Sequence, residues 1–235
     1  SFNTKFNINT SLKTITIDPT NFTIQNIKLL TSGAINYSDH SSVDIKFKNE
    51  KANAKELIGI LPSSIKTSFE NLKLDGNLGI DGFISGDFSK NETLSVGFDY
   101  ELINGNLLLK ESGIGIKQLN AKGNFSMPNI DNNGDSKFNC IIKSASNGSN
   151  QIEGNIEVND FNRPNIKWQG RAQLDPTFIS QFTDSSNFIP SSGRIQLDGM
   201  LSIIYDINQS KIVPNTFDYD GIITIKNIQG KTNNP

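Results

Sequence analysis

Five aspartates in this sequence could, in pairs, supply the acid and the base that hydrolyse a glycosidic bond. They are Asp75, Asp81, Asp87, Asp198 and Asp218. Each stands on the polar parity of an alternating stretch or beside a glycine in a turn, where a carboxylate normally faces solvent. The sequence has no Gly-x-Ser-x-Gly, no Walker loop and no pair of histidines. We therefore predict that the chain is not an enzyme and holds no cofactor.

Three single residues could also do chemistry. The one cysteine, Cys140, and the one histidine, His40, are far apart in the sequence and do not suggest a zinc site. Cys140 is in phase with Phe138 and Ile142, which predicts a small buried residue rather than a reactive thiol. Trp168 lies on the apolar parity of its stretch, which favours core packing over a platform for stacking sugars.

Composition narrows the class of protein further. The 235 residues carry a net charge of -2, with 22 Lys and Arg dispersed among 24 Asp and Glu. Binding of phosphate backbones needs a concentrated basic surface, so we expect no nucleic-acid partner. No stretch approaches the roughly 18 apolar residues that span a bilayer. The chain opens inside a strand-like pattern, "SFNTKFNIN", and we read it as a piece of a longer protein.

The elements that must position these residues are strands. In "NLKLDGNLGIDGFISGDF", residues 71–88, apolar and polar side chains alternate, which is typical of a strand with one apolar face. Gly76, Gly82 and Gly86 fall on the apolar parity, which suggests a sheet that curves. About fourteen such runs predict an all-β chain of antiparallel strands. The two Asn-Gly pairs, at 104–105 and 147–148, predict tight hairpins.

Two short helices interrupt the strands and introduce a repeat. "NAKELIGILPSSI" predicts a helix that ends at Pro62, and a second helix is expected with Asp175 as its N-cap. Each helix precedes an "LDG" strand, at residues 74 and 197, and then an "FDY" strand, at 98 and 217. The period of about 120 residues predicts one elongated fragment over 1–235 with repeat units near 50–110 and 175–227.

The strands of the repeat share a single apolar surface that only two small helices could cover. A sandwich of two sheets would hide this surface, and the pattern alone favours that arrangement. A folded-over sheet would instead leave it lining a groove for lipid. The residues assigned to the surface are Leu74, Leu78, Ile80, Ile84, Phe98, Tyr100, Ile195, Leu197, Leu201 and Ile203.

The stretch "ELIGILPSSIKTSFENLKLDGNLGIDGFISGDFS" resembles AsmA-like proteins, in which a short helix ending at "LLP" is followed by strands with spaced glycines. The matching positions here are Leu61 and Pro62, then Gly76, Leu78, Gly82 and Gly86, and the resemblance extends from about residue 30 to residue 227. It implies a curved antiparallel sheet folded into a groove or an open sandwich, and no catalytic residues.

The AsmA-like resemblance also implies a function. It points to a periplasmic segment of a bacterial envelope protein, with an inner-membrane anchor outside this fragment. Such proteins are implicated in outer-membrane assembly and in handling phospholipid or another acyl lipid, with other envelope proteins as possible partners. The alternative is a surface-exposed β-sandwich that binds carbohydrate or protein as an adhesion module. Neither reading involves a metal.

Overall fold

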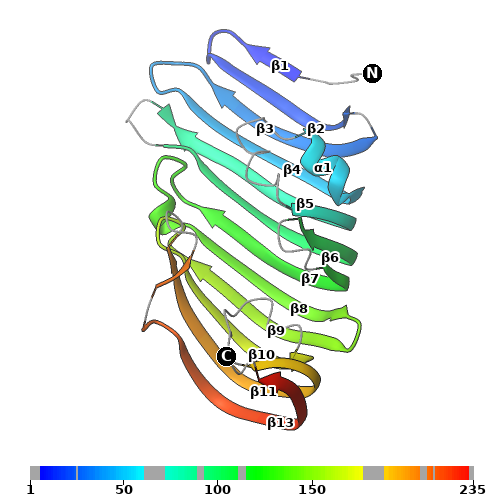
Figure 1. Cartoon of the computed structure of the whole chain (residues 1–235). Helices are drawn as coiled ribbons and strands as arrows, with labels where there is room; N and C mark the ends of the chain where they lie inside the picture. The colour runs from blue at the N-terminus through cyan, green and yellow to red at the C-terminus, as the bar shows by residue number, and fades with distance from the viewer. Residues whose placement is uncertain are drawn as a thin grey trace.

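The computed structural model describes residues 6–24, 26–60, 72–88, 93–110, 115–176, 188–206, 211–213 and 215–232. Within these ranges thirteen strands form one antiparallel sheet, in which each strand from β1 to β11 pairs with the next one in sequence and β13 pairs with β11 (Figure 1). The strands are β1 (Phe6–Asn9), β2 (Thr14–Ile24), β3 (Ile27–Asn36), β4 (Ser42–Asn53), β5 (Leu72–Asp87), β6 (Ser95–Leu109), β7 (Gly115–Met127), β8 (Lys137–Asn147), β9 (Asn150–Asn159), β10 (Asn165–Leu174), β11 (Phe188–Asp206), β12 (Lys211–Ile212) and β13 (Asp218–Thr232).

The sheet is curved and does not close, which confirms the predicted all-β fold class. β11 pairs with β10 along its second half, with β13 along most of its length, and with the two-residue β12 near its end. In the described part of the chain, β1 at one end of the sheet and β13 at the other each pair with one strand only, so they are its edge strands. None of the described helices is long and apolar enough to cross a membrane.

The predicted hairpin at Asn104-Gly105 is wrong. β6 runs straight through this pair, and the two residues instead form a bulge opposite Gly76 of β5. Asn104 has a φ of 53°, so the pair supplies the left-handed backbone that a bulge needs as readily as a turn does. At the bulge β6 has one residue more than β5, which shifts the alternation of its side chains by one position. Leu102 and Leu107 therefore face the same side of the sheet.

The second Asn-Gly pair is a hairpin, as predicted. β8 ends at Asn147, which pairs with Asn150 at the start of β9. Gly148 occupies the turn with a φ of 61°, a backbone conformation that glycine adopts without steric strain.

The first predicted helix is α1 (Ala54–Ile60). The Asn53 side-chain oxygen accepts a hydrogen bond from the Lys55 N–H (2.9 Å), so Asn53 caps its N-terminus. Ala54 and Leu57 are buried where the helix packs on β4 and β5. The expected end of this helix at Pro62, and most of the second helix expected after Asp175, lie at 61–71 and 177–187, outside the described residues.

Polar and charged side chains occupy one side of the sheet, which we call the polar face. Three ion pairs lie there. Lys48–Asp81 (3.1 Å) and Arg171–Asp198 (3.0 Å) join neighbouring strands, and Glu101–Lys143 (3.4 Å) reaches from β6 across β7 to β8. Their side chains are half exposed or more, so each pair contributes little to the free energy of unfolding. This placement fits the interpretation of Asp81 and Asp198 as solvated carboxylates.

Candidate functional site

The ten residues assigned to an apolar surface lie on one side of the sheet, which we call the apolar face. In β5 and β6, Ile80 is opposite Tyr100 and Leu78 is opposite Leu102. Six strands away, Leu201 of β11 belongs to the same cross-strand row as Ile80. The full row, read from partner to partner, is Ile80, Tyr100, Gly123, Cys140, Ile156, Trp168 and Leu201. The structure thus connects the two sets of predicted residues through four strands that the prediction did not include.

Among the described residues, no second sheet packs against the apolar face. All ten predicted residues are partly exposed. Only eight of the described hydrophobic residues are buried, and four of these are alanines. The surface of the chain, 15144 Å², also exceeds the roughly 10,500 Å² expected for a compact monomer of 25.9 kDa. The sandwich favoured by the pattern alone is therefore wrong, because alternation identifies a face but not what covers it.

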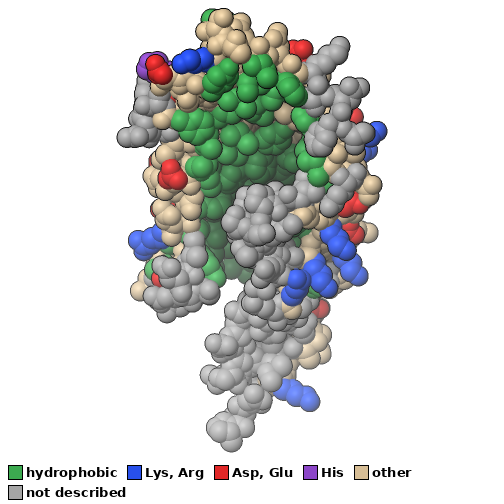
Figure 2. Space-filling model, turned by 90° about the horizontal axis from the view of Figure 1, so that it is seen from above, with side chains coloured by type: hydrophobic (Ala, Val, Ile, Leu, Met, Phe, Trp, Pro, Cys, Tyr) green, Lys and Arg blue, Asp and Glu red, His purple; other side chains and the backbone are tan. Residues whose placement is uncertain are grey.

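Seen from above, the apolar side chains line the inside of a trough between two polar rims (Figure 2). The trough continues to the edge strand β13, where Ile223 and Ile225 project from the apolar face. These two side chains are 52% and 62% exposed. Exposed contiguous apolar surface on this scale is uncommon on soluble monomers and is typical of a binding surface.

Glycines on the apolar face allow the sheet to curve. A Cβ placed at Gly82 would come within 2.6 Å of the Gly97 carbonyl oxygen and 2.7 Å of the Phe98 Cβ. Four further glycines lie opposite one another on adjacent strands, and we call them the four-glycine row. They are Gly154, Gly170, Gly199 and Gly221. Neighbouring backbones approach so closely along this row that a side chain has no space, which agrees with the predicted role of spaced glycines.

An aromatic cluster lies in the middle of the trough. Tyr100 and Phe138 are stacked with ring centroids 5.6 Å apart, and Phe98 lies 5.1 Å from Phe125. The Tyr100 hydroxyl donates to the Asn139 carbonyl oxygen (3.2 Å), which satisfies its polar end. Phe125 and Phe138 were not among the predicted site residues. Their alternation was visible in the sequence, but only the strand register places them beside Phe98 and Tyr100.

Trp168 and Cys140 also belong to the apolar face. Both are half-buried, so the sequence-based expectations of core packing for Trp168 and of burial for Cys140 are met only in part. The indole N–H of Trp168 is buried and has no hydrogen-bond partner among the described residues. Trp168 lies between Ile156 and Leu201 in adjacent strands.

The Cys140 thiol is expected to be a poor nucleophile. Burial raises the pKa of Cys140, and the interaction of its thiol with the Tyr100 hydroxyl offsets only part of this rise. Burial likewise raises the pKa of Tyr100. At neutral pH, iodoacetamide should therefore alkylate Cys140 more slowly in the folded chain than in urea. Above the thiol's unfolded-state pKa, the unfolded chain loses its proton first, so the free energy of unfolding should fall there and be unaffected below it. Equal alkylation rates in the two states would contradict this placement of Cys140.

The predicted repeat falls on two pairs of antiparallel strands. One copy occupies β5 and β6, where Tyr100 is opposite Ile80, and the other occupies β11 and β13, where Tyr219 is opposite Leu201. The two copies differ locally, because Gly76 faces a bulge whereas Gly199 pairs directly with Gly221. The equivalence of the two units remains a prediction.

Comparisons with protein-family models, curated proteins and solved structures find no match to this chain. The AsmA-like reading therefore remains an interpretation of the sequence pattern. The described residues also contain no group of three His, Cys, Asp or Glu side chains that could hold a metal ion.

Proposed function

We propose that the chain is a non-enzymatic lipid-handling segment whose apolar face binds the acyl chains of phospholipid or a similar lipid. The observation that carries the proposal is the continuous trough of half-exposed aliphatic and aromatic side chains between β4 and β13 (Figure 2). Transfer of each methylene group from water to such a surface contributes roughly 0.8 kcal/mol. A long apolar ligand therefore gains much more from this trough than a small polar one.

The arrangement of polar groups also favours a lipid. The row from Ile80 to Leu201 contains no charged side chain, and its one hydroxyl, that of Tyr100, already donates to Asn139. An acyl chain needs no hydrogen-bond partner along such a row. The polar rims leave the head group of the lipid in contact with water.

We place this activity in the setting that the AsmA-like resemblance implies. The chain would be the periplasmic, β-rich part of an envelope protein that is anchored in the inner membrane by a segment outside this fragment. It would contribute to outer-membrane assembly by handling phospholipid, alone or with other envelope proteins. The alternative, an adhesive β-sandwich, needs a second sheet over the apolar face, and the described residues provide one sheet.

Photocrosslinking tests the proposed lipid-binding surface directly. A photoreactive amino acid is placed at Ile80 or Ile203 on the apolar face and, as a matched control, at Ile141, an exposed residue on the polar face of β8. The folded chain is then illuminated with phospholipid vesicles. We expect lipid adducts at positions 80 and 203 and none at 141. Adducts of equal yield at all three positions, or only at 141, would contradict a role for the apolar face.

A further inference from the structure

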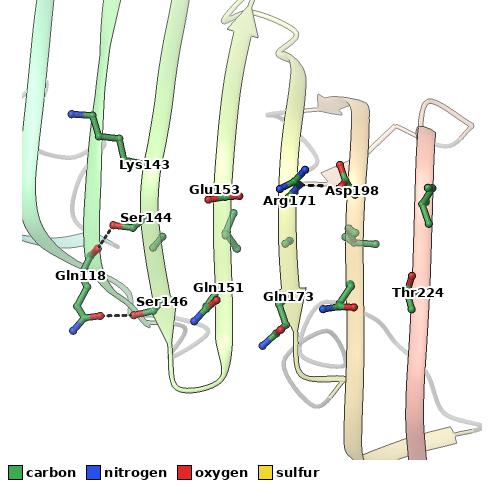
Figure 3. A pocket seen from close by; sticks show the side chains of 16 residues that line it. Gln118, Lys143, Ser144, Ser146, Gln151, Glu153, Arg171, Gln173, Asp198 and Thr224 are labelled. Carbon is green, nitrogen blue, oxygen red and sulfur yellow. Dashed lines mark hydrogen bonds and ion pairs between the residues drawn. The ribbon is translucent and has the colours of Figure 1, made fainter.

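A depression of about 650 Å³ lies on the opposite side of the sheet from the trough, over β7 to β11 and β13 (Figure 3). The side chains of polar parity that line it are carboxamides, hydroxyls, two acids, two bases and the isoleucine Ile222. This feature is independent of the proposed lipid-binding surface, because residues of opposite parity on the same strands form it.

The polar side chains of the depression form two parallel rows across the strands. In the first row Gln151, Gln173 and Gln196 are directly opposite one another on β9, β10 and β11. Ser146 extends this row on β8 and Thr224 extends it on β13. Neighbouring strands are roughly 4.8 Å apart, so successive carboxamides repeat at that spacing. We call this set the carboxamide row.

The second row lies two residues away along β9, β10 and β11 and contains equal numbers of acidic and basic side chains. Glu153, Arg171 and Asp198 are opposite one another on β9, β10 and β11, with Lys143 beside them on β8. Arg171 donates to Asp198 (3.0 Å) and Lys143 to Glu101 (3.4 Å). Two acids and two bases line the depression, so it offers no net charge to an ionic ligand.

Some of the carboxamides form hydrogen bonds within the protein and others do not. The Gln118 side-chain oxygen accepts from Ser146 Oγ (3.1 Å), and Gln173 Nε2 donates to the Ser149 carbonyl oxygen (3.2 Å). The side chains of Gln151 and Gln196 make no hydrogen bond with the described residues. Each of these two carboxamides presents a free donor and a free acceptor to the depression.

From these rows we infer that the depression binds a neutral oligosaccharide that runs across the strands, along the carboxamide row. A carboxamide can donate to one ligand hydroxyl and accept from its neighbour, which matches the vicinal hydroxyls of a sugar. The repeat of the row is comparable with the length of one sugar residue in an extended glycan. An anionic ligand fits less well because Arg171 and Lys143 already pair with carboxylates. An extended peptide would use the open edge of β13 rather than this face.

Titration of the ¹⁵N-labelled chain with chitotetraose, maltotetraose and cellotetraose tests this inference. We expect saturable shifts of the Gln151, Gln173 and Gln196 side-chain NH₂ signals with at least one of these glycans, and no loss of affinity when the salt concentration is raised. Gln196→Ala should weaken binding roughly tenfold, since it removes a donor and an acceptor together. Gln151→Ala should act in the same direction.

Gln229→Ala provides the matched control, because Gln229 lies outside the depression and accepts a hydrogen bond from Ser192. It should bind as tightly as the parent chain, with the same urea midpoint. The inference is overturned if none of the three glycans produces saturable shifts, or if Gln196→Ala and Gln151→Ala both bind like the Gln229 variant. Binding that weakens steeply with salt would also overturn it, in favour of an ionic ligand.

Discussion

Gly170→Ala is expected to lower the free energy of unfolding by about 3 kcal/mol, a large effect for the addition of one methyl group. The new Cβ would overlap the Glu153 carbonyl oxygen of β9 and come within 2.6 Å of the Gly154 Cα. Both obstacles are backbone atoms, so the strands must separate and the curvature of the sheet along the four-glycine row must relax. Urea denaturation monitored by circular dichroism measures the change.

Gly115→Ala is the control for this prediction. Gly115 also lies in a strand, but a Cβ there would meet its nearest atoms at 3.8 Å, which is ordinary van der Waals contact. The substitution also restricts the unfolded chain, so its stability should be unchanged or rise by up to about 1 kcal/mol. If both variants have the urea midpoint of the parent chain, the close approach of strands at Gly170 does not determine the curvature of the sheet.

Ile80→Asp is expected to abolish capture of lipid while it lowers the free energy of unfolding by only about 1–2 kcal/mol. Ile80 is partly exposed on the open face of the trough, so a carboxylate at this position stays in contact with water. An acyl chain bound against neighbouring Tyr100 would cover this carboxylate and remove its water, which costs free energy and prevents binding. The prediction requires both measurements, the urea midpoint and the yield of phospholipid that remains bound after purification from vesicles.

Leu102→Asp supplies the comparison on an adjacent strand. Leu102 is 6% exposed and lies opposite Leu78, so an aspartate there would be buried without a partner. Its cost is expected to be about 4 kcal/mol or more. Equal, large destabilisation by the two substitutions would mean that Ile80 belongs to a closed core, and the open trough would be contradicted.

Much of the fold could be predicted from local sequence pattern. Strict alternation identified the strands and their apolar sides, and glycines on that parity indicated that the sheet curves. The helical spacing of Leu57, Ile60 and Leu61, followed by Pro62, predicted the helix that is α1. These features are local consequences of side-chain direction and backbone sterics, so they can be read without knowledge of the partner strands.

The rest depended on partners that are distant in sequence. Asn104-Gly105 tolerates positive φ in a turn and in a bulge alike, and pairing of β6 with β5 and β7 on both sides decides for the bulge. The sandwich was favoured because parity does not reveal whether a second layer exists. The carboxamide row could not be found at all, because Gln151 and Gln196 become neighbours of Gln173 only through the register of three strands.

Fluorescence of Trp168 tests the central claim most directly, because the sequence has one tryptophan and the structure places it on the apolar face between Ile156 and Leu201. The measurement compares its emission after incubation with vesicles of phospholipid brominated on the acyl chains and with vesicles of the unbrominated lipid, the protein being separated from vesicles before reading. Bromine quenches an indole only when the two are in close contact. We predict strong quenching by the brominated lipid in the parent chain and none in Ile80→Asp, which retains Trp168. Equal emission with the two lipids in the parent chain would show that no acyl chain lies in the trough and would contradict the proposed function.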